Sequence, residues 1–198
     1  DEERVEIPSG VVKLDEYSFS AKERVRTVVI PATVEYINTS AFLNCPALTE
    51  FIVDADNARF YAEDGVIYEK GADKLILFPC GRSGSYGVRD GVRELGAGAF
   101  FSTSLTSLQI PASVTAIGEG LIDLSESLSE ILVDEGNAVY ASADGLLCNK
   151  ALDTLLLVPS AISGEHTIPD SIHELGEGVF YGCNRLTKIT LSAGLEAV

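Results

Sequence analysis

The four cysteines carry the most reactive side chains of the sequence, but their spacing fits no common metal motif. They are Cys45, Cys80, Cys148 and Cys183, and no two of them form a Cys-x-x-Cys pair. Structural zinc sites are usually built on such pairs, because one short turn then presents two thiolates to the same ion. We therefore expect no zinc site.

The two histidines, His166 and His173, also lack the partners that catalysis would require. No His-Glu-x-x-His motif is present, and no nucleophile stands at a readable spacing from either histidine. His166 matches Tyr86 on a strand and should be half-buried, whereas His173 matches Arg93 on a polar stretch. We expect no catalytic residue and no cofactor site.

Two short acidic runs resemble cation ligands at first sight. A calcium loop needs more than acidity, because a glycine must make the turn and a final glutamate must bind with both oxygens. The full pattern of such a loop is absent, so we interpret the runs as Asx turns that lead the chain out of a strand. The runs are Asp54, Asp56 and Asn57, and Asp134, Glu135 and Asn137.

The net charge of −16 excludes some classes of partner. Nucleic acids and anionic membrane surfaces are bound through Lys and Arg, which are in the minority here. No apolar run reaches the ~18 residues that a membrane span requires, so no membrane insertion is expected. The sequence starts at Asp1 without a visible signal peptide, and we expect any targeting segment to have been removed or to lie outside this sequence.

A strict repeat of apolar residues organises the whole sequence. From Ile30 the next apolar positions follow at gaps of 4, 3, 5, 6, 3 and 2 residues, and the same gaps recur from Ile7, Ile110 and Ile168. A further copy from Val88 is one residue shorter. The distance from Ile7 to Ile30 gives a unit of 23 residues. Repeats of this length are typical of solenoids.

A second level of repetition lies above the first. Ile30 and Ile110 are 80 residues apart, as are Val53 and Val133. We interpret the stretches 30–109 and 110–190 as a duplicated cassette within a single solenoid, residues 1–198, which is a fragment of a longer array. Inside each cassette a 35-residue segment, 53–88 or 133–168, departs from the 23-residue unit.

The spacing predicts short parallel strands stacked coil upon coil. The two-residue alternation typical of a strand is seen at Leu108 and Ile110, at the end of the apolar run that starts at Leu105. Pro111 then ends the strand pairing because it has no N–H. A single coil cannot bury its apolar face, but stacked coils can. The expected interior ladder of large side chains consists of Phe19, Phe42, Phe100, Ile122 and Phe180.

Each 35-residue segment is predicted to form a β-hairpin insertion. In the first, a strand-like run at 65–68 and an apolar run at 75–78 enclose polar residues, and Asp64-Gly65 signals a turn at the entry. The segment around Asp144-Gly145 follows the same pattern. The second strand of each hairpin should join the solenoid as an extra short coil.

These residues resemble the BspA-type leucine-rich repeat. The resemblance is carried by strings such as Ile110-Pro-Ala-Ser-Val114-Thr-Ala-Ile117-Gly118, and five copies share one register across essentially the whole chain. It implies a leucine-rich-repeat solenoid that is rich in β-structure. It also implies a bacterial surface or secreted protein that takes part in adhesion. Phe and Cys are usual in this repeat near Ile122, where the sequence departs from the pattern.

The repeat also bears on the cysteines. Cys45 and Cys183 each follow a ladder phenylalanine by three residues, in coils that are separated by several others. Such a separation exceeds disulfide reach, and Cys80 and Cys148 hold non-equivalent places in the two cassettes. Cys45 and Cys183 are therefore expected to be small buried thiols, and no disulfide is expected between Cys80 and Cys148.

Alternation from the inward-facing anchors predicts which strand residues point to solvent. On a solenoid these side chains form a continuous face, and repeat proteins commonly bind partners there. The apolar members of this face would favour a contact site. The candidate binding face comprises Thr27, Val29, Glu50, Ile52, Ser107, Gln109, Glu130, Leu132, Lys188 and Thr190.

The sequence thus predicts a non-catalytic module, extracellular or at the cell surface, that binds a protein ligand such as a host matrix protein or a bacterial surface protein. Two alternatives remain open. The chain could be a structural spacer that presents another domain of a larger surface protein, or, more remotely, a carbohydrate-active enzyme that uses paired acids.

Overall fold

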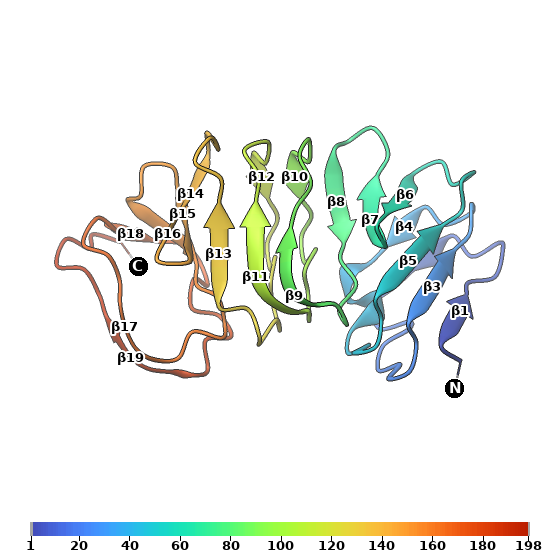
Figure 1. The fold of residues 1–198 in the computed structure, drawn as a ribbon, viewed down its shortest axis with the longest axis horizontal. Helices are drawn as coiled ribbons and strands as arrows, with labels where there is room; N and C mark the ends of the chain where they lie inside the picture. Colours follow the sequence, from blue (N-terminus) through green and yellow to red (C-terminus); the bar gives the residue numbers. More distant parts are fainter. Residues whose placement is uncertain (1, 198) are drawn as a thin grey trace. The chain divides into compact units, whose positions relative to one another are not determined.

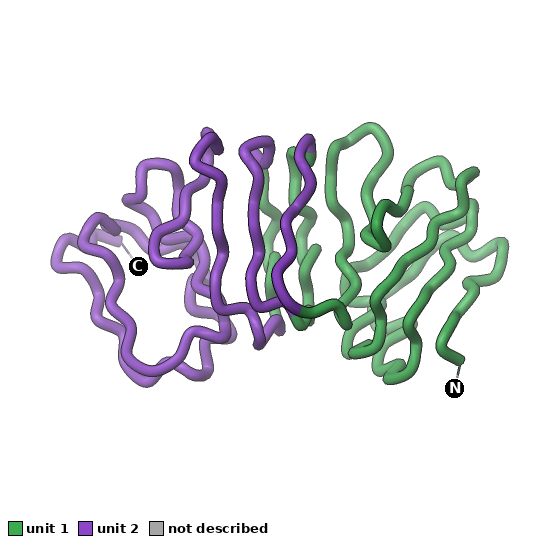
Figure 2. Tube along the Cα trace, viewed as in Figure 1, with its two compact units in different colours: residues 1–83, 92–104, 116–123 green, residues 84–91, 105–115, 124–198 purple. Residues whose placement is uncertain are grey.

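The computed structural model describes residues 2–197, and nearly all of their regular structure is β-strand. The strands of the chain stack in parallel about 23 residues apart, in the coils of a β-solenoid (Figure 1). Contacts divide it into two compact units (Figure 2). Unit 1 comprises residues 1–83, 92–104 and 116–123, and unit 2 comprises residues 84–91, 105–115 and 124–198.

The first sheet of unit 1 is built from strands one repeat apart. Its order is β1-β3-β5, and all pairings are parallel. The register places Val28 beside Phe51, so alternate residues point into the core and the remaining ones point outward. The strands are β1 (Arg4–Glu6), β3 (Thr27–Ile30) and β5 (Glu50–Val53).

On the return leg of the coils, very short strands pair in the same parallel way. β2 (Lys13–Leu14) pairs with β4 (Tyr36–Ile37). A 3-10 helix, η1 (Thr39–Phe42), follows β4. The Asn38 side chain caps this helix by accepting the Ser40 N–H, which satisfies one of its free donors.

The first insertion forms a meander that leads back into the solenoid. Asp64 and Gly65, both with positive φ, make the tight turn between β6 and β7, as the Asp-Gly pair predicts. β7 then pairs antiparallel with β8, and β8 pairs in parallel with β10, which continues to β12. The strands are β6 (Phe60–Glu63), β7 (Val66–Glu69), β8 (Lys74–Leu77), β10 (Glu94–Leu95) and β12 (Ala116–Ile117).

The core of unit 1 is a column of apolar side chains. Phe42 stacks on Phe19 with ring centroids 5.6 Å apart and meets Phe51 edge-on at 5.1 Å. Phe100 lies 5.3 Å from Phe78 and is only 1% exposed. Burying each such side chain contributes roughly 1.5–3 kcal/mol. Of the expected ladder, Phe42, Phe100 and Ile122 are buried, whereas Phe19 and Phe180 are half-buried.

Unit 2 repeats this architecture. One parallel sheet has the order β13-β11-β9, and a second consists of β17 and β19. The strands are β9 (Ser83–Gly87), β11 (Ser104–Ile110), β13 (Glu130–Val133), β17 (Gly164–Thr167) and β19 (Leu186–Thr190); the first residue of β9 and of β11 falls in unit 1.

The second insertion matches the first strand for strand. β14, β15 and β16 form an antiparallel meander, and β16 pairs in parallel with β18. The unit 2 core cluster includes Leu146, Leu155 and Ile172. The strands are β14 (Tyr140–Ala143), β15 (Leu146–Asn149), β16 (Thr154–Leu157) and β18 (Glu174–Leu175).

The predicted fold class is confirmed: a leucine-rich-repeat solenoid of stacked parallel strands with two hairpin insertions. The structure adds one strand to each hairpin, β6 and β14, which precede the Asp-Gly turns. Residues 60–63 and 140–143 lack a clear apolar alternation, so the sequence did not reveal them. The single array and the duplicated cassette stay predictions.

Candidate functional site

Four predicted face residues come together on adjacent strands of unit 1. The register of β3 with β5 places Thr27 beside Glu50 and Val29 beside Ile52. Thr27 Oγ1 donates a hydrogen bond to Glu50 Oε2 over 3.2 Å. Glu50 is exposed and the other three are half-buried, so all four remain accessible on one surface, which we call the unit 1 face.

A hollow of about 460 Å³ opens beside β5 on this unit. It is lined by β5, including Glu50 and Ile52, by the turn at Asp64 and Gly65, and by Arg82. The Arg82 guanidinium lies 5.0 Å over the Phe78 ring, and its Nη1 donates to the Asp64 carbonyl over 2.8 Å. The insertion therefore adds both a wall and a positive charge next to the predicted residues.

The unit 2 face has the same register, with one correction. Ser107 lies beside Glu130, and Gln109 lies beside Leu132, which is 39% exposed. The expectation that Ser107 points to solvent is wrong, because its side chain is only 7% exposed. β11 is the central strand of its sheet, so the short serine side chain is flanked by neighbours on both sides.

Lys188 and Thr190, the last two predicted residues, are exposed on β19 of unit 2. They lie beside Glu165 and Thr167 of β17. Lys188 Nζ forms an ion pair with Glu165 at 3.0 Å. Since both partners are more than half exposed, solvent screens the pair and it adds little stability.

Six further residues, which the sequence analysis missed, belong to the faces of the two units. They lie on strands paired with the predicted ones, and all six are exposed. The signal was available in the repeat, because Val88 and Ile168 hold the same place as Ile30, so the outward positions can be counted back from them. The residues are Arg4, Glu6, Ser85, Gly87, Glu165 and Thr167.

The acidic runs form turns, as predicted. The Asp54 side chain accepts the Asp56 N–H at 2.9 Å, and Asp134 accepts the Gly136 N–H at 2.8 Å. Each is an Asx turn at the end of a strand, so the carboxylates serve the backbone. Within residues 2–197 no group of three or more His, Cys, Asp or Glu is arranged to hold a metal ion.

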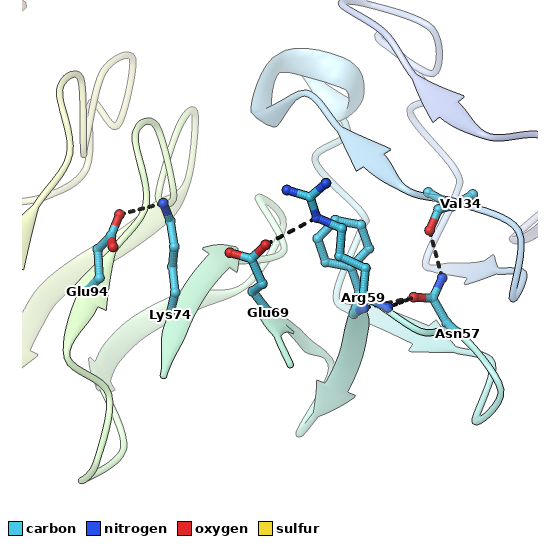
Figure 3. A network of polar contacts seen from close by, with 7 residues as sticks. Val34, Asn57, Arg59, Glu69, Lys74 and Glu94 are labelled. Carbon is cyan, nitrogen blue, oxygen red and sulfur yellow. Dashed lines mark hydrogen bonds and ion pairs between the residues drawn. The ribbon is translucent and has the colours of Figure 1, made fainter. Parts of the chain in front are cut away.

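Asn57 fixes the first of these turns to the coil before it (Figure 3). Its Nδ2 donates to the carbonyls of Pro31 and Val34 at 3.0 and 2.9 Å. Its Oδ1 accepts the backbone N–H groups of Arg59 and Phe60 at 2.9 and 2.7 Å. The fully buried amide therefore meets four backbone groups.

Ion pairs join the first insertion to its neighbours in the same view (Figure 3). Arg59 Nε lies 3.1 Å from Glu69 Oε1, which connects the start of β6 with the end of β7. Lys74 pairs with Glu94 and so joins β8 to β10. These contacts position the meander, and with it the turn that walls the hollow.

The histidines lie where the sequence placed them. His166 is half-buried on β17, and His173 is exposed. In the part of the chain that the structure describes, no helix is long and apolar enough to cross a membrane.

Three of the cysteines, Cys45, Cys80 and Cys148, are buried, and Cys183 is half-buried. Burial raises the pKa of the Cys148 thiol to about 11 and also raises that of Cys183. What the sequence did not reveal is that Cys45 and Cys80 are neighbours. Cys80 Sγ donates to the Cys45 carbonyl at 3.0 Å.

The model of the BspA type leucine rich repeat region matches six copies, over residues 2–63, 80–151 and 162–198. No curated protein sequence matches the chain.

Solved structures share the fold at low sequence identity. A leucine-rich repeat protein from Eubacterium ventriosum is 23% identical with a TM-score of 0.61, over 98% of this chain and 49% of that one. The pneumococcal vaccine antigen PcpA is 23% identical with a TM-score of 0.54, over 98% and 46%. A leucine rich cell surface protein from Faecalibacterium prausnitzii is 24% identical with a TM-score of 0.56, over 96% and 60%.

The chain therefore spans about half to three fifths of the length of these proteins. Its six repeat copies, which cover most of the sequence, show that it belongs to the BspA-type leucine-rich repeat family.

Proposed function

We propose that the chain is a protein-binding module of a bacterial surface or secreted protein, and that the strand faces carry the binding. Leucine-rich repeat proteins of this type are interaction scaffolds and are not typically catalytic. The proposal is supported by one observation above all. On unit 1, Val29 and Ile52 lie side by side next to the hollow lined by Glu50 and Arg82.

The chemistry of that surface suits a protein partner. Val29 and Ile52 offer apolar area, which contributes most to affinity where a partner excludes water from it. Around them Thr27, Glu50 and Arg82 offer hydrogen bonds and charges of both signs, which orient a partner. The hollow is large enough to receive a side chain or a short loop.

The cell surface is the location that the relatives suggest. One structural neighbour is described as a cell surface protein and another as a vaccine antigen. Adhesion to a host matrix protein or to a bacterial surface protein is the specific role we propose.

Binding to a panel of immobilised host matrix proteins and bacterial surface proteins, measured by surface plasmon resonance, tests the proposal. For any ligand found, Ile52→Glu should weaken binding at least tenfold, because it places a charge in the contact. Tyr36→Glu is the matched control. Tyr36 is 42% exposed but belongs to β4 on the return leg, so affinity should not change.

A ligand that binds Ile52→Glu and Val29→Glu as tightly as the unchanged chain would contradict the strand face of unit 1 as its site. If no panel member binds at all, the spacer hypothesis is favoured instead.

A further inference from the structure

We propose that Cys45 and Cys80 form a disulfide between neighbouring coils of unit 1 when the chain meets a disulfide oxidant. This inference rests on the proposed function in one respect, which is that the chain is located outside the cytoplasm. Disulfide oxidants are found there, and structural disulfides persist there.

The two cysteines contact each other although 35 residues separate them. Cys80 Sγ donates to the Cys45 carbonyl at 3.0 Å, whereas Cys45 Sγ donates to the Phe19 carbonyl at 3.1 Å, so the Cys45 side chain must turn toward Cys80 for the sulfurs to bond. Stacked coils are about 4.8 Å apart, which falls within the ~4.4–6.8 Å between Cα atoms that a disulfide spans. A disulfide therefore needs little movement of the backbone.

Gly81 brings the two coils closer than another residue would allow. Its N–H donates to the Leu48 carbonyl at 2.8 Å. A Cβ atom added at Gly81 would stand 2.5 Å from the Pro46 carbonyl oxygen, against backbone that cannot swing away. The residue next to Cys80 is thus packed directly on the chain that follows Cys45.

Unit 2 contains the same contact with serines in place of cysteines. Ser160 lies 35 residues after Ser125, and its Oγ donates to the Ser125 carbonyl at 3.0 Å. The fold therefore accepts a pair of small hydrogen-bonding residues here without a covalent bond. Two serines cannot form a covalent bond at this contact, whereas the two thiols in unit 1 can be oxidised to a disulfide.

The reaction balances with a disulfide such as oxidised glutathione. The Cys45 thiolate attacks the glutathione disulfide, forms a mixed disulfide and releases one glutathione thiolate. Cys80 then loses its proton and attacks the Cys45 sulfur, which releases the second glutathione thiolate. The two protons from the protein thiols end on the two glutathiones. Two glutathiones are formed for each protein disulfide.

The electrostatics favour Cys45 as the first nucleophile. A hydrogen bond from Cys80 lowers the pKa of Cys45 to about 7, whereas the same interaction and burial raise the pKa of Cys80. A thiolate reacts and a thiol does not, so Cys45 is the better attacker near neutral pH. Since the side chains are only 1% and 6% exposed, oxidation should be faster during folding than in the folded chain.

Disulfide mapping tests the proposal. The reduced, unfolded chain is returned to buffer with reduced and oxidised glutathione, free thiols are alkylated, and peptides are identified by mass spectrometry. We expect a linked pair of peptides containing Cys45 and Cys80, with Cys148 and Cys183 alkylated. The chain purified folded and reduced, then held with oxidised glutathione, should form the same linked pair more slowly, because both thiols are buried.

The double variant C45S/C80S is the matched control, because it copies Ser125 and Ser160. It should fold with an unchanged circular dichroism spectrum and the same Tm in oxidising and reducing buffer. The unchanged chain should gain about 5–10 °C in Tm on oxidation, since a 35-residue loop is closed. Full alkylation of Cys45 and Cys80 in the chain refolded with oxidised glutathione, or a different pairing there, overturns the proposal.

Discussion

Asn57 and Asn137 hold the same place in the two units and make the same four hydrogen bonds. Asn137 Nδ2 donates to the carbonyls of Pro111 and Val114, and its Oδ1 accepts the N–H groups of Val139 and Tyr140. Both amides are completely buried. Each asparagine side chain therefore supplies hydrogen bonds to backbone groups where a coil continues into its insertion.

Asn57→Ala should therefore destabilise the chain by about 3 kcal/mol. The substitution removes the side-chain partner of the Val34 carbonyl and of two N–H groups in the interior, while the Pro31 carbonyl still accepts the Val34 N–H. Each unpaired buried group costs about 1–3 kcal/mol before relaxation. Urea unfolding followed by circular dichroism measures the effect. Asn184→Ala, at an exposed position, should stay within about 0.5 kcal/mol of the unchanged chain.

Phe100→Ala should cost about 3–5 kcal/mol. Phe100 is 1% exposed and packs on Phe78, so truncation leaves a cavity that the neighbouring coils cannot close. Tyr181→Ala removes a side chain of similar size that is 65% exposed, and it should change stability little. Equal losses for the two variants would argue against an apolar column at Phe100.

Gly65→Ala should destabilise more than Gly71→Ala, although both glycines have a φ of +73°. The backbone strain is then the same, at roughly 1–2 kcal/mol. At Gly65 the new Cβ would also stand 3.2 Å from Glu50 Cα, whereas at Gly71 nothing lies within 4 Å. The difference between the unfolding free energies of the two variants measures the cost of the close contact between the turn and β5. Equal unfolding free energies would contradict that contact.

Two aspartates should respond to pH with opposite signs. Burial raises the pKa of Asp123, so its ionised form is disfavoured in the folded chain. Stability from this group is present below the usual aspartate pKa of about 4 and is lost as the pH rises through the folded value. Asp123→Asn should therefore stabilise the chain at about pH 7 and have no effect at about pH 3.

Asp153 behaves in the reverse way. Hydrogen bonds from Asn149 and then Thr154 lower the pKa of its carboxyl group, so its contribution is present at neutral pH and is lost on acidification. Asp153→Asn should destabilise at about pH 7, with the difference shrinking towards about pH 3. Urea midpoints at the two pH values measure both variants, and effects of the same sign would refute the assignment.

Much of the fold could be predicted from the sequence because the repeat constrains it tightly. A register kept by Ile7, Ile30, Ile110 and Ile168 is consistent with stacked parallel strands, and the structure has them. The strand face followed from alternation alone. Ser107 was misplaced because alternation gives the direction of a side chain but takes no account of its length.

The contact between Cys45 and Cys80 could not be read from the 23-residue period. The insertion lengthens that one coil, so the two cysteines stand 35 residues apart and seem to hold unrelated positions. The larger repeat contains the clue, because Ser125 and Ser160 have the same separation. In the folded chain, the residue that lies 35 positions after Cys45 still falls in the next coil.

The Asp-Gly turns have one more consequence, which concerns solubility. β5 and β13 are each at the edge of their sheets, where free N–H groups would invite another chain to add a strand. Phe51 N–H donates to the Gly65 carbonyl at 3.0 Å, and Ile131 N–H donates to the Gly145 carbonyl at 2.8 Å. Each turn thus occupies a donor that could otherwise seed intermolecular β-pairing, so shortening the insertions should promote aggregation.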